Sequence, residues 1–311
     1  MDTLRDRSLL VRVREQPLLR SNVVILVIGG TGRTGRRIVD NLLARGERLR
    51  LLLRPTSTVP PAWDVERAVG DLNDCDSLRR AMSDVDAVFV LSPMDPLLDR
   101  IEAKVFDAAL DRGVEHVIKM STTKPEPDSP IPWWRAHWRA ENALRNSGLR
   151  WTILRPNGIS FFLLGHAETV RDYGELRTAA GDGRMALIDA DDIGAVAAAV
   201  FADRNRYEGT VLDLTGPAAV SYDDVAEQLT ALSDRHISHV DISPEDARGT
   251  MLASGVAEWE AEGTIANWKM TRDGSGGFDR VTNDVERVAA RRPFALERFL
   301  SAHRHLFVPA R

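Results

Sequence analysis

One segment near the start of the chain limits its possible folds more than any other. The apolar run at residues 23–28 is followed by GGTGRTG at residues 29–35, and apolar residues then recur at helical spacing over residues 38–43. A continuous apolar run is typical of a strand buried on both faces of a parallel sheet. The three spaced glycines permit a tight turn, close approach of a pyrophosphate and close packing of the helix on the sheet. The segment therefore predicts a strand, loop and helix that bind a dinucleotide.

Segments typical of strands and of helices alternate along the next part of the chain. The expected strands cover residues 49–53, 67–69, 86–91, 115–120 and 151–155, and the expected helices cover residues 76–83, 97–112 and 134–147. Alternation at this rhythm is typical of βα units. The predicted fold class is therefore α/β, with a Rossmann-type doubly wound parallel sheet and a smaller, mostly helical C-terminal lobe.

Three regions are expected along the chain. Residues 1–22 are interpreted as a flexible N-terminal extension, because their arginines alternate with short apolar pairs and they lack the features of a signal peptide. A DNA-contacting arm is the alternative, although acidic residues interrupt the segment. Residues 23–155 are expected to form the nucleotide-binding core. Residues 156–311 are expected to form a substrate lobe interleaved with that core, since strands near 184–189 and 211–214 are predicted to return to the sheet.

The later helices carry their own start signals. Asp192 precedes an alanine-rich apolar segment and is interpreted as the N-cap of a helix. Ser221 and Asp224 have the spacing of a capping box. A short strand is expected over residues 236–242, and residues 244–308 are expected to be mostly helical.

Composition excludes several classes of function. The 311 residues include 41 basic and 46 acidic side chains, a net charge of −5, which offers no general attraction to nucleic acid. The single cysteine, Cys75, cannot form an internal disulfide or a multi-thiolate metal site, and the histidines show no metal-ligand spacing. No apolar run approaches the roughly 20 residues that a bilayer span needs. We expect a cytoplasmic protein with a small-molecule substrate, no metal, no membrane partner, and a monomeric or homodimeric state.

The end of the second expected strand distinguishes NAD from NADP. NAD-binding proteins of this fold usually place an acidic residue there, which binds the ribose 2′-hydroxyl. Residues 51–57 contain no acid but do contain Arg54, and Arg33 lies in the glycine loop. A planar guanidinium binds a 2′-phosphate well. NADP(H) is therefore favoured, although Arg54 has the alternative interpretation of an ordinary exposed arginine.

Several segments, in their order, resemble the NmrA-like family, an atypical branch of the short-chain dehydrogenase/reductase superfamily. Besides the glycine loop and Arg54, they are Gly70-Asp71-Leu72, Lys119-Met120-Ser121, His137-Trp138-Arg139-Ala140-Glu141, Leu154-Arg155-Pro156-Asn157-Gly158, Ile188-Asp189-Ala190-Asp191-Asp192-Ile193 and Leu214-Thr215-Gly216-Pro217. The resemblance covers about residues 23–308. The family includes NADPH-dependent quinone reductases, isoflavone-reductase-like enzymes, ergot-alkaloid reductases and non-catalytic regulators that sense the NADP state. It therefore implies the fold and the cofactor more than the reaction.

The resemblance also implies which residues contact NADP(H). The implied contacts are Gly29, Thr31, Gly32, Arg33, Thr34 and Gly35 for the pyrophosphate, Arg54 for the 2′-phosphate, Asp71 and Leu72 for the adenine, Leu91, Ser92 and Pro93 for the ribose, and Pro156, Asn157 and Gly158 for the nicotinamide end. Ser121 ends the strand that is implied to face the nicotinamide. Asp71 has a second interpretation, as a cap at the end of a strand.

The chain departs from ordinary short-chain dehydrogenases at their Tyr-x-x-x-Lys motif. Alignment on Glu141 places His137 at the lysine position and Trp133 at the tyrosine position. None of the three tyrosines lies in that helix, so no phenolic acid is expected there. His137, with Ser121, is the candidate catalytic residue, since imidazole titrates near neutral pH. The alternatives are direct hydride transfer with a proton from solvent, or a purely structural histidine.

Aromatic residues gather near the two segments expected to flank the nicotinamide. The candidate substrate pocket consists of Trp133, Trp134, Phe161, Phe162 and His166. Aromatic side chains suit a flat substrate, and ordinary core packing is the competing interpretation.

Three functions remain open from the sequence. The first is an NADPH-dependent oxidoreductase that transfers hydride to a planar conjugated molecule, such as a quinone, an enone or an imine or iminium ion. The second is a non-catalytic NADP(H)-sensing regulator, which the absent tyrosine supports. The third is a non-redox enzyme, an isomerase or cyclase, on the same fold, because fold alone does not determine function.

Overall fold

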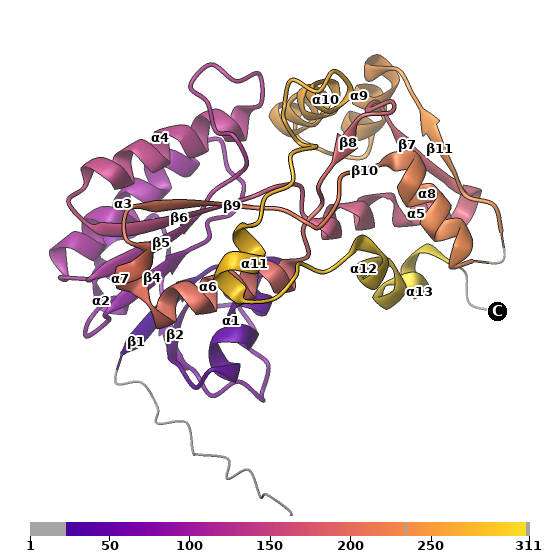
Figure 1. The fold of residues 1–311 in the computed structure, drawn as a ribbon. Coiled ribbons are helices and arrows are strands. Elements are labelled where there is room, and N and C mark those ends of the chain that lie inside the picture. The colour runs from indigo at the N-terminus through magenta and orange to yellow at the C-terminus, as the bar shows by residue number, and fades with distance from the viewer. Residues whose placement is uncertain (1–22, 234, 309–311) are drawn as a thin grey trace, which may run out of the picture.

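The computed structural model describes residues 23–233 and 235–308. Within this part of the chain, a seven-stranded sheet forms the centre of the larger lobe, in the order β3-β2-β1-β4-β5-β6-β9 (Figure 1). Its strands, which all pair in parallel, are β1 (Val24–Ile28), β2 (Arg48–Leu53), β3 (Glu66–Val69), β4 (Ala87–Val90), β5 (His116–Met120), β6 (Arg150–Pro156) and β9 (Thr210–Leu214). The predicted doubly wound α/β fold is confirmed. The expected extension at residues 1–22 lies outside the described residues.

Helices cover both faces of this sheet. One face carries α1 (Arg33–Ala44), α6 (Ala190–Ala202) and α11 (Asp284–Ala289), and the other carries α2 (Cys75–Ala81), α3 (Leu98–Asp111) and α4 (Pro132–Asn146) (Figure 1). The short α7 (Arg204–Tyr207) leads into β9. Right-handed crossovers between parallel strands require helices on both faces, which explains why β1, β4 and β5 are buried throughout.

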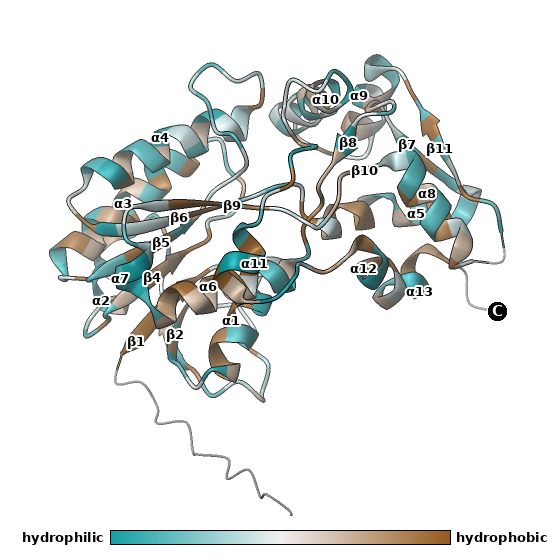
Figure 2. Ribbon diagram, in the orientation of Figure 1, coloured by the Kyte–Doolittle hydropathy of each residue, from teal (hydrophilic) through white to brown (hydrophobic). Residues whose placement is uncertain are grey.

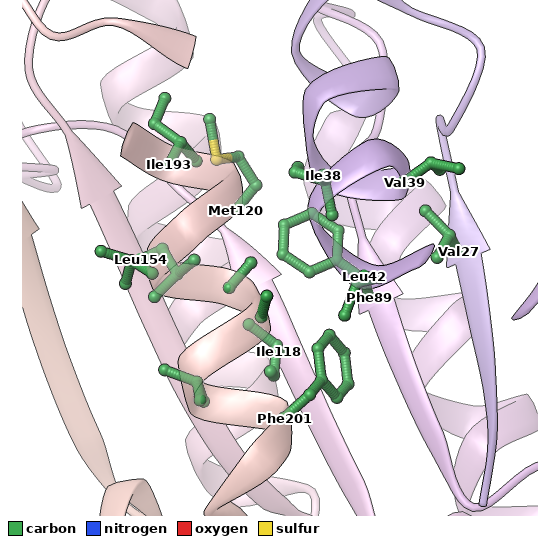
Figure 3. Close-up of a cluster of buried hydrophobic side chains, with 14 of the residues drawn as sticks. Val27, Ile38, Val39, Leu42, Phe89, Ile118, Met120, Leu154, Ile193 and Phe201 are labelled. Atoms are coloured by element: carbon green, nitrogen blue, oxygen red, sulfur yellow. The ribbon is translucent and has the colours of Figure 1, made fainter. Parts of the chain in front are cut away.

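Alternate residues of each strand supply the two cores. In β1, Ile25 and Val27 belong to the core beneath α1 and α6, whereas Leu26 and Ile28 belong to the core on the opposite face. Figure 3 shows the first of these cores, with side chains of both helices and of the central strands pointing toward one another. Phe89 and Phe201 lie there with ring centroids 6.4 Å apart. The brown central strands and mixed-colour helices of Figure 2 show the same arrangement in hydropathy.

The C-terminal lobe contains two small sheets and most of the later helices. In one sheet β7 (Glu175–Thr178) pairs in parallel with β11 (Ser238–Asp241), and in the other β8 (Arg184–Met185) pairs antiparallel with β10 (Val220–Ser221). Its helical segments are the 3₁₀ helix η1 (Ser160–His166), α5 (Ala167–Tyr173), α8 (Tyr222–Ala231), α9 (Pro244–Ala253), α10 (Glu258–Arg272), α12 (Leu296–Ala302) and α13 (Arg304–Phe307). The expected strand within 236–242 and the helical character of 244–308 are confirmed.

One predicted strand does not return to the main sheet. β9 does so beside β6, as expected, but the segment 184–189 pairs with β10, and its Ile188 forms a bridge with Ile159 outside the main sheet. The backbone of Ala186 explains this difference. Its N–H donates to the carbonyl of Phe278, and its carbonyl accepts from Gly216. These hydrogen bonds occupy the groups that pairing with the main sheet would need.

The starts of α6 and α8 test two capping interpretations. The capping box of Ser221 and Asp224 is confirmed, with both hydrogen bonds present. The N-cap assignment of Asp192 is wrong, because Asp189 caps α6 by accepting a hydrogen bond from the N–H of Asp191. Asp192 lies inside the helix, where its fully buried carboxylate accepts from the Arg291 guanidinium at 2.5 Å. It therefore ties α6 to the segment after α11.

Among the helices of residues 23–233 and 235–308, none combines the length and the apolar character that a bilayer crossing requires.

Candidate active site

The glycine loop lies at the carboxyl end of β1, where its backbone leaves room for a ligand. Gly29 has a φ of 78°, and a Cβ there would lie 2.2 Å from the Leu91 carbonyl oxygen. A Cβ on Gly35 would lie 2.0 Å from the Gly29 carbonyl oxygen, so both glycines are required by close approach. Helix α1 begins at Arg33 without a side-chain cap from any described residue and without an acid in its first turn. Its free N–H groups and positive end fit the pyrophosphate of a dinucleotide.

The two candidate phosphate-binding arginines lie on different parts of this edge. Arg54 follows β2, is exposed, and makes no ion pair with any described residue. Arg33 lies 5.7 Å from the centroid of the Phe161 ring, so the structure brings it to η1. Asp71 accepts a hydrogen bond from the N–H of Asn73 at 2.7 Å, which is the capping role that its second interpretation expected. One carboxylate oxygen of Asp71 is thereby engaged locally.

The segments expected near the ribose and nicotinamide end the central strands. Leu91, Ser92 and Pro93 follow β4, and the buried Ser92 hydroxyl has no hydrogen-bond partner among the described residues. Asn157, after β6, donates through Nδ2 to the Phe278 carbonyl oxygen at 2.7 Å. Its amide therefore ties the sheet to the C-terminal lobe. The structure brings these segments to the same edge as the glycine loop, as parallel strands require.

A buried carboxylate organises the end of β5. Ser121 donates its hydroxyl proton to Glu141 Oε1 at 2.6 Å. Arg155 donates to the same carboxylate from Nε at 2.9 Å and from Nη2 at 2.5 Å, and Arg145 donates at 2.8 Å. Burial alone would raise the pKa of Glu141, but the hydrogen bonds from Arg155 and Ser121 outweigh it and lower that pKa. Glu141 is therefore ionised and fixes the orientation of the Ser121 hydroxyl.

A second buried polar group lies beside the first and includes His137. Lys119 Nζ lies 3.1 Å from His137 Nδ1 and 2.5 Å from Glu102 Oε2, and the side chains of Lys119 and Glu102 are fully buried. Burial and the neighbouring Lys119 ammonium lower the pKa of His137 well below its usual range. Burial raises the pKa of Glu102, although Lys119 opposes that shift. The His137 imidazole is therefore neutral at physiological pH.

The five predicted pocket aromatics divide between core and surface. Trp134 is fully buried, with its ring centroid 5.5 Å from that of Phe278, so its assignment to an open pocket is wrong. Helix α4 turns this face into the core of the C-terminal lobe. Phe162 is 57% exposed and lies 4.7 Å from Phe161 between ring centroids, so these two rings remain available to a ligand.

The other two aromatics are constrained by their neighbours. Trp133 is only partly buried, and its ring lies so close to α10 that a Cβ on Gly263 would be 2.2 Å from it. His166 lies among Tyr222 and Trp268, with ring centroids 6.1 and 6.4 Å away, and burial lowers its pKa to about 4. His166 is therefore a neutral packing residue of the C-terminal lobe.

A cavity of about 330 Å³ opens where the core meets the C-terminal lobe. It lies at the ends of β6 and β9, beneath the loop that follows α10, and Arg155 connects it to Glu141. Its lining residues are Thr123, Lys124, Arg155, Asn157, Asp213, Thr215, Gly276, Gly277, Arg280 and Thr282. Sequence patterns did not indicate this cavity, because its lining comes from segments far apart in the chain.

Three residues of the site were missed by the sequence patterns. Lys119 lies in a segment that resembles the NmrA-like family but received no role of its own, although a charge inside the apolar run of residues 116–120 is itself unusual. Glu102 lies on the same helical face as Leu98 and Val105, both buried, which is a similar signal. Glu141 served only as an alignment position. Among the described residues, no group of three or more potential ligands has metal-binding geometry.

Comparison with known proteins agrees with the geometry of this edge. A family model described as NAD(P)H-binding matches residues 29–204. An NAD(P)H azoreductase of Xenophilus azovorans is 34% identical over 239 residues, which cover 76% of this chain and 82% of that protein.

Solved structures share the fold at lower identity. An NADPH-dependent quinone oxidoreductase of Escherichia coli, complexed with NADPH, has a TM-score of 0.80 at 22% identity and covers 89% of this chain and 99% of its own. A Citrobacter sp. triphenylmethane reductase has a TM-score of 0.79 at 23% identity and covers 91% and 99%. Identities this low establish the common fold alone.

Proposed function

The chain belongs to the NAD(P)H-binding family, with the NmrA-like fold of atypical short-chain dehydrogenases, and is an NAD(P)H-dependent reductase; on that premise we propose that it reduces planar conjugated acceptors with NADPH. The acceptor class comprises quinones, enones and imine or iminium ions. The azoreductase relative adds azo dyes to the compounds worth testing. The observation that carries this proposal is the neutral, half-buried His137, held against Lys119, where a tyrosine-based acid is absent.

The preference for NADPH is supported by the charge at the end of β2. Arg54 is exposed there without a partner among the described residues, and residues 51–57 contain no acid that would repel a 2′-phosphate. A charge-assisted hydrogen bond to the phosphate contributes about 1.5–3 kcal/mol, which is roughly tenfold to a hundredfold in affinity.

The acid available at the site determines which acceptors suit it. When bound, the reduced nicotinamide supplies hydride. Of the three tyrosines, Tyr222 lies in the C-terminal lobe, where burial raises its pKa to about 12, and none lies in α4. A neutral imidazole is a weak acid, so it serves best where the hydride adduct is a delocalised anion, as with quinones, or needs no proton, as with iminium ions. Phe161 and the exposed Phe162 offer flat apolar surfaces to such acceptors.

A panel of acceptors tests this proposal. Purified protein is given NADPH and, separately, a quinone, a cyclic iminium ion, an enone, an azo dye and an unactivated ketone, and NADPH oxidation is followed by absorbance. We expect kcat/KM for the quinone to exceed that for the ketone at least about 100-fold, since a neutral imidazole is too weak an acid to assist a localised alkoxide and the loss of such assistance costs roughly that much. Equal rates on both would contradict the proposed acceptor class. Tight NADPH binding without oxidation by any acceptor would contradict turnover of this acceptor class altogether.

A further inference from the structure

Lys119 occupies an unusual place for a charged side chain. It lies in β5, a central strand of the sheet, and has no exposed surface. Its neighbour Met120 points into the core beneath α1 and α6, so Lys119 points to the opposite face, between α3 and α4. There its ammonium group reaches Glu102 of α3 and His137 of α4. A charge placed here costs several kcal/mol in desolvation unless its partners compensate for it.

Two hydrogen-bond partners and one carboxylate surround the ammonium group. Lys119 Nζ lies 2.5 Å from Glu102 Oε2, 3.1 Å from the Met120 carbonyl oxygen and 3.1 Å from His137 Nδ1. An ammonium has three N–H donors and no acceptor, so Lys119 can only donate to the Met120 carbonyl oxygen and to His137 Nδ1, while Glu102 supplies the opposite charge. Because Lys119 donates to it, His137 Nδ1 must be unprotonated.

This assignment does not depend on which member of the ion pair carries the shared proton. If that proton lies on Glu102, the neutral Lys119 amine accepts a hydrogen bond from the Glu102 carboxylic acid. The amine then keeps two N–H donors for the Met120 carbonyl oxygen and His137 Nδ1. His137 Nδ1 is an acceptor in both cases. A neutral imidazole with an acceptor Nδ1 carries its proton on Nε2. Nε2 makes no hydrogen bond with any described residue, so its N–H is available to a ligand.

We propose that Lys119 and Glu102 are positioning residues that fix His137 as an Nε2–H donor and resupply its proton during turnover. This inference rests on the proposed reductase function. After hydride adds to the acceptor, the His137 Nε2–H bond breaks and its proton goes to the anionic adduct. A Lys119 Nζ–H bond breaks in the same step, and that proton forms a bond with Nδ1. His137 stays neutral and Lys119 becomes a neutral amine. After the product leaves, solvent protonates Nε2, the Nδ1–H bond breaks and that proton returns to Lys119 Nζ.

Strand β5 supplies the cation that helix α4 lacks. In ordinary short-chain dehydrogenases a lysine of the helix carries the cation, whereas this chain has His137 at that position by alignment. Lys119 brings a cation to the same place from β5. The remaining charges near His137 are paired among themselves: Glu141 of α4 binds Arg145 and Arg155, so they do not compete for Lys119.

The tautomer of His137 is the direct test. Protein labelled with ¹⁵N-histidine is studied by NMR with and without NADP⁺, at pH 6–9. We expect the His137 signals of the Nε2–H tautomer across this range. An Nδ1–H tautomer, or rapid exchange of both, would overturn the inference. This readout needs no turnover, so it decides the positioning role even if the acceptor panel disproves the proposed function.

Kinetics of a charge-removing double variant test the resupply step. Lys119→Met with Glu102→Gln removes the pair at similar volume, and Arg291→Met with Asp192→Asn removes a partly buried pair on the other face as a control. We expect kcat for an enone to fall about tenfold to a hundredfold in the first variant. We also expect the acid limb of its pH profile to move toward higher pH, because burial still lowers the pKa of His137 but the Lys119 ammonium no longer does. The titratable and charged groups of this cluster are Lys119, which contacts His137, Glu102, which pairs with Lys119, and Glu141 on the same helix as His137, which pairs with Arg145 and Arg155. An unchanged kcat and pH profile, or the same change in the control, would overturn the resupply role.

Discussion

The two faces of β5 differ in what they bury. Ile118 and Met120 point toward α1 and α6, into a core made of apolar side chains. Lys119 and Ser121 point toward α3 and α4, where Glu102, His137 and Glu141 form buried polar groups. Helices cover both faces, yet only one face carries groups that can move protons. Strand β5 therefore has one apolar face that stabilises the fold and one polar face whose groups can transfer protons.

The cost of each arrangement follows from its chemistry. Apolar burial contributes roughly 25 cal/mol per Å² and requires no partner. Buried charges contribute little to stability even when they are paired, and they destabilise strongly when one partner is lost. The polar face is thus expected to be the more fragile to single substitutions and the more dependent on pH.

The largest effect is expected from breaking the buried ion pair. Lys119→Met leaves Glu102 without a cation, which costs about 3–5 kcal/mol of unfolding free energy. Burial raises the pKa of Glu102 in the folded state, so the folded variant retains a proton that the unfolded chain releases. Its stability is therefore highest below the unfolded pKa and falls as pH rises through the folded pKa. Urea unfolding at pH 5 and pH 8 measures this, and an equal loss at both pH values would contradict it.

A smaller loss is expected on the apolar face. Ile118→Ala removes a fully buried side chain between the sheet and α6 and costs roughly 3 kcal/mol. Its cost is independent of pH, and kcat on a quinone stays within about twofold of the original because no polar group moves. Unfolding by urea and steady-state kinetics on one preparation measure both. A strong pH dependence here would erase the distinction between the faces.

Glu141 tests the other half of the polar face. Glu141→Gln replaces charge-assisted hydrogen bonds to Arg155 and Arg145 and costs roughly 2 kcal/mol at neutral pH. The folded pKa of Glu141 is lowered, so its contribution is present above the unfolded pKa and is lost as pH falls through the folded pKa. The difference between original and variant should therefore shrink in acid. A constant difference down to pH 3 would contradict this sign.

The smallest effect concerns the cofactor edge, away from both faces. Arg54→Gln should weaken NADPH about tenfold and leave NADH and the unfolding free energy unchanged, since Arg54 has no partner among the described residues. Arg45→Gln, at the far end of α1, is the matched control and should change neither affinity. Fluorescence titration measures both cofactors. Equal weakening of NADPH and NADH would remove the 2′-phosphate role from Arg54.

Local signals in the sequence predicted much of the fold and the nucleotide edge. The strands of the sheet, the glycine loop before α1 and the capping box of Ser221 follow from short-range patterns. The assignment of Asp192 failed because a second acid, Asp189, precedes it and takes the cap. The strand near 184–189 failed because Phe278 and Gly216, distant in sequence, take its backbone hydrogen bonds.

The polar face was harder to predict because its contacts join separate elements. Lys119 meets Glu102 and His137 from two helices, and no spacing in the sequence records that meeting. Trp134 was misassigned because a helical pattern does not say which of two cores a buried face meets. A charge within an apolar strand was nevertheless visible in the sequence. Such a residue indicates either an error of interpretation or a functional group.

The central claim is that His137 donates a proton where an ordinary short-chain dehydrogenase uses tyrosine. The most direct test compares His137→Gln with the original enzyme on an enone and on an iminium ion, with NADPH saturating. The enone adduct needs a proton and the iminium adduct does not, so we predict a loss in kcat of about 100-fold on the enone and less than about threefold on the iminium ion. Equal losses on both acceptors would show that His137 serves binding or folding alone and would contradict the account.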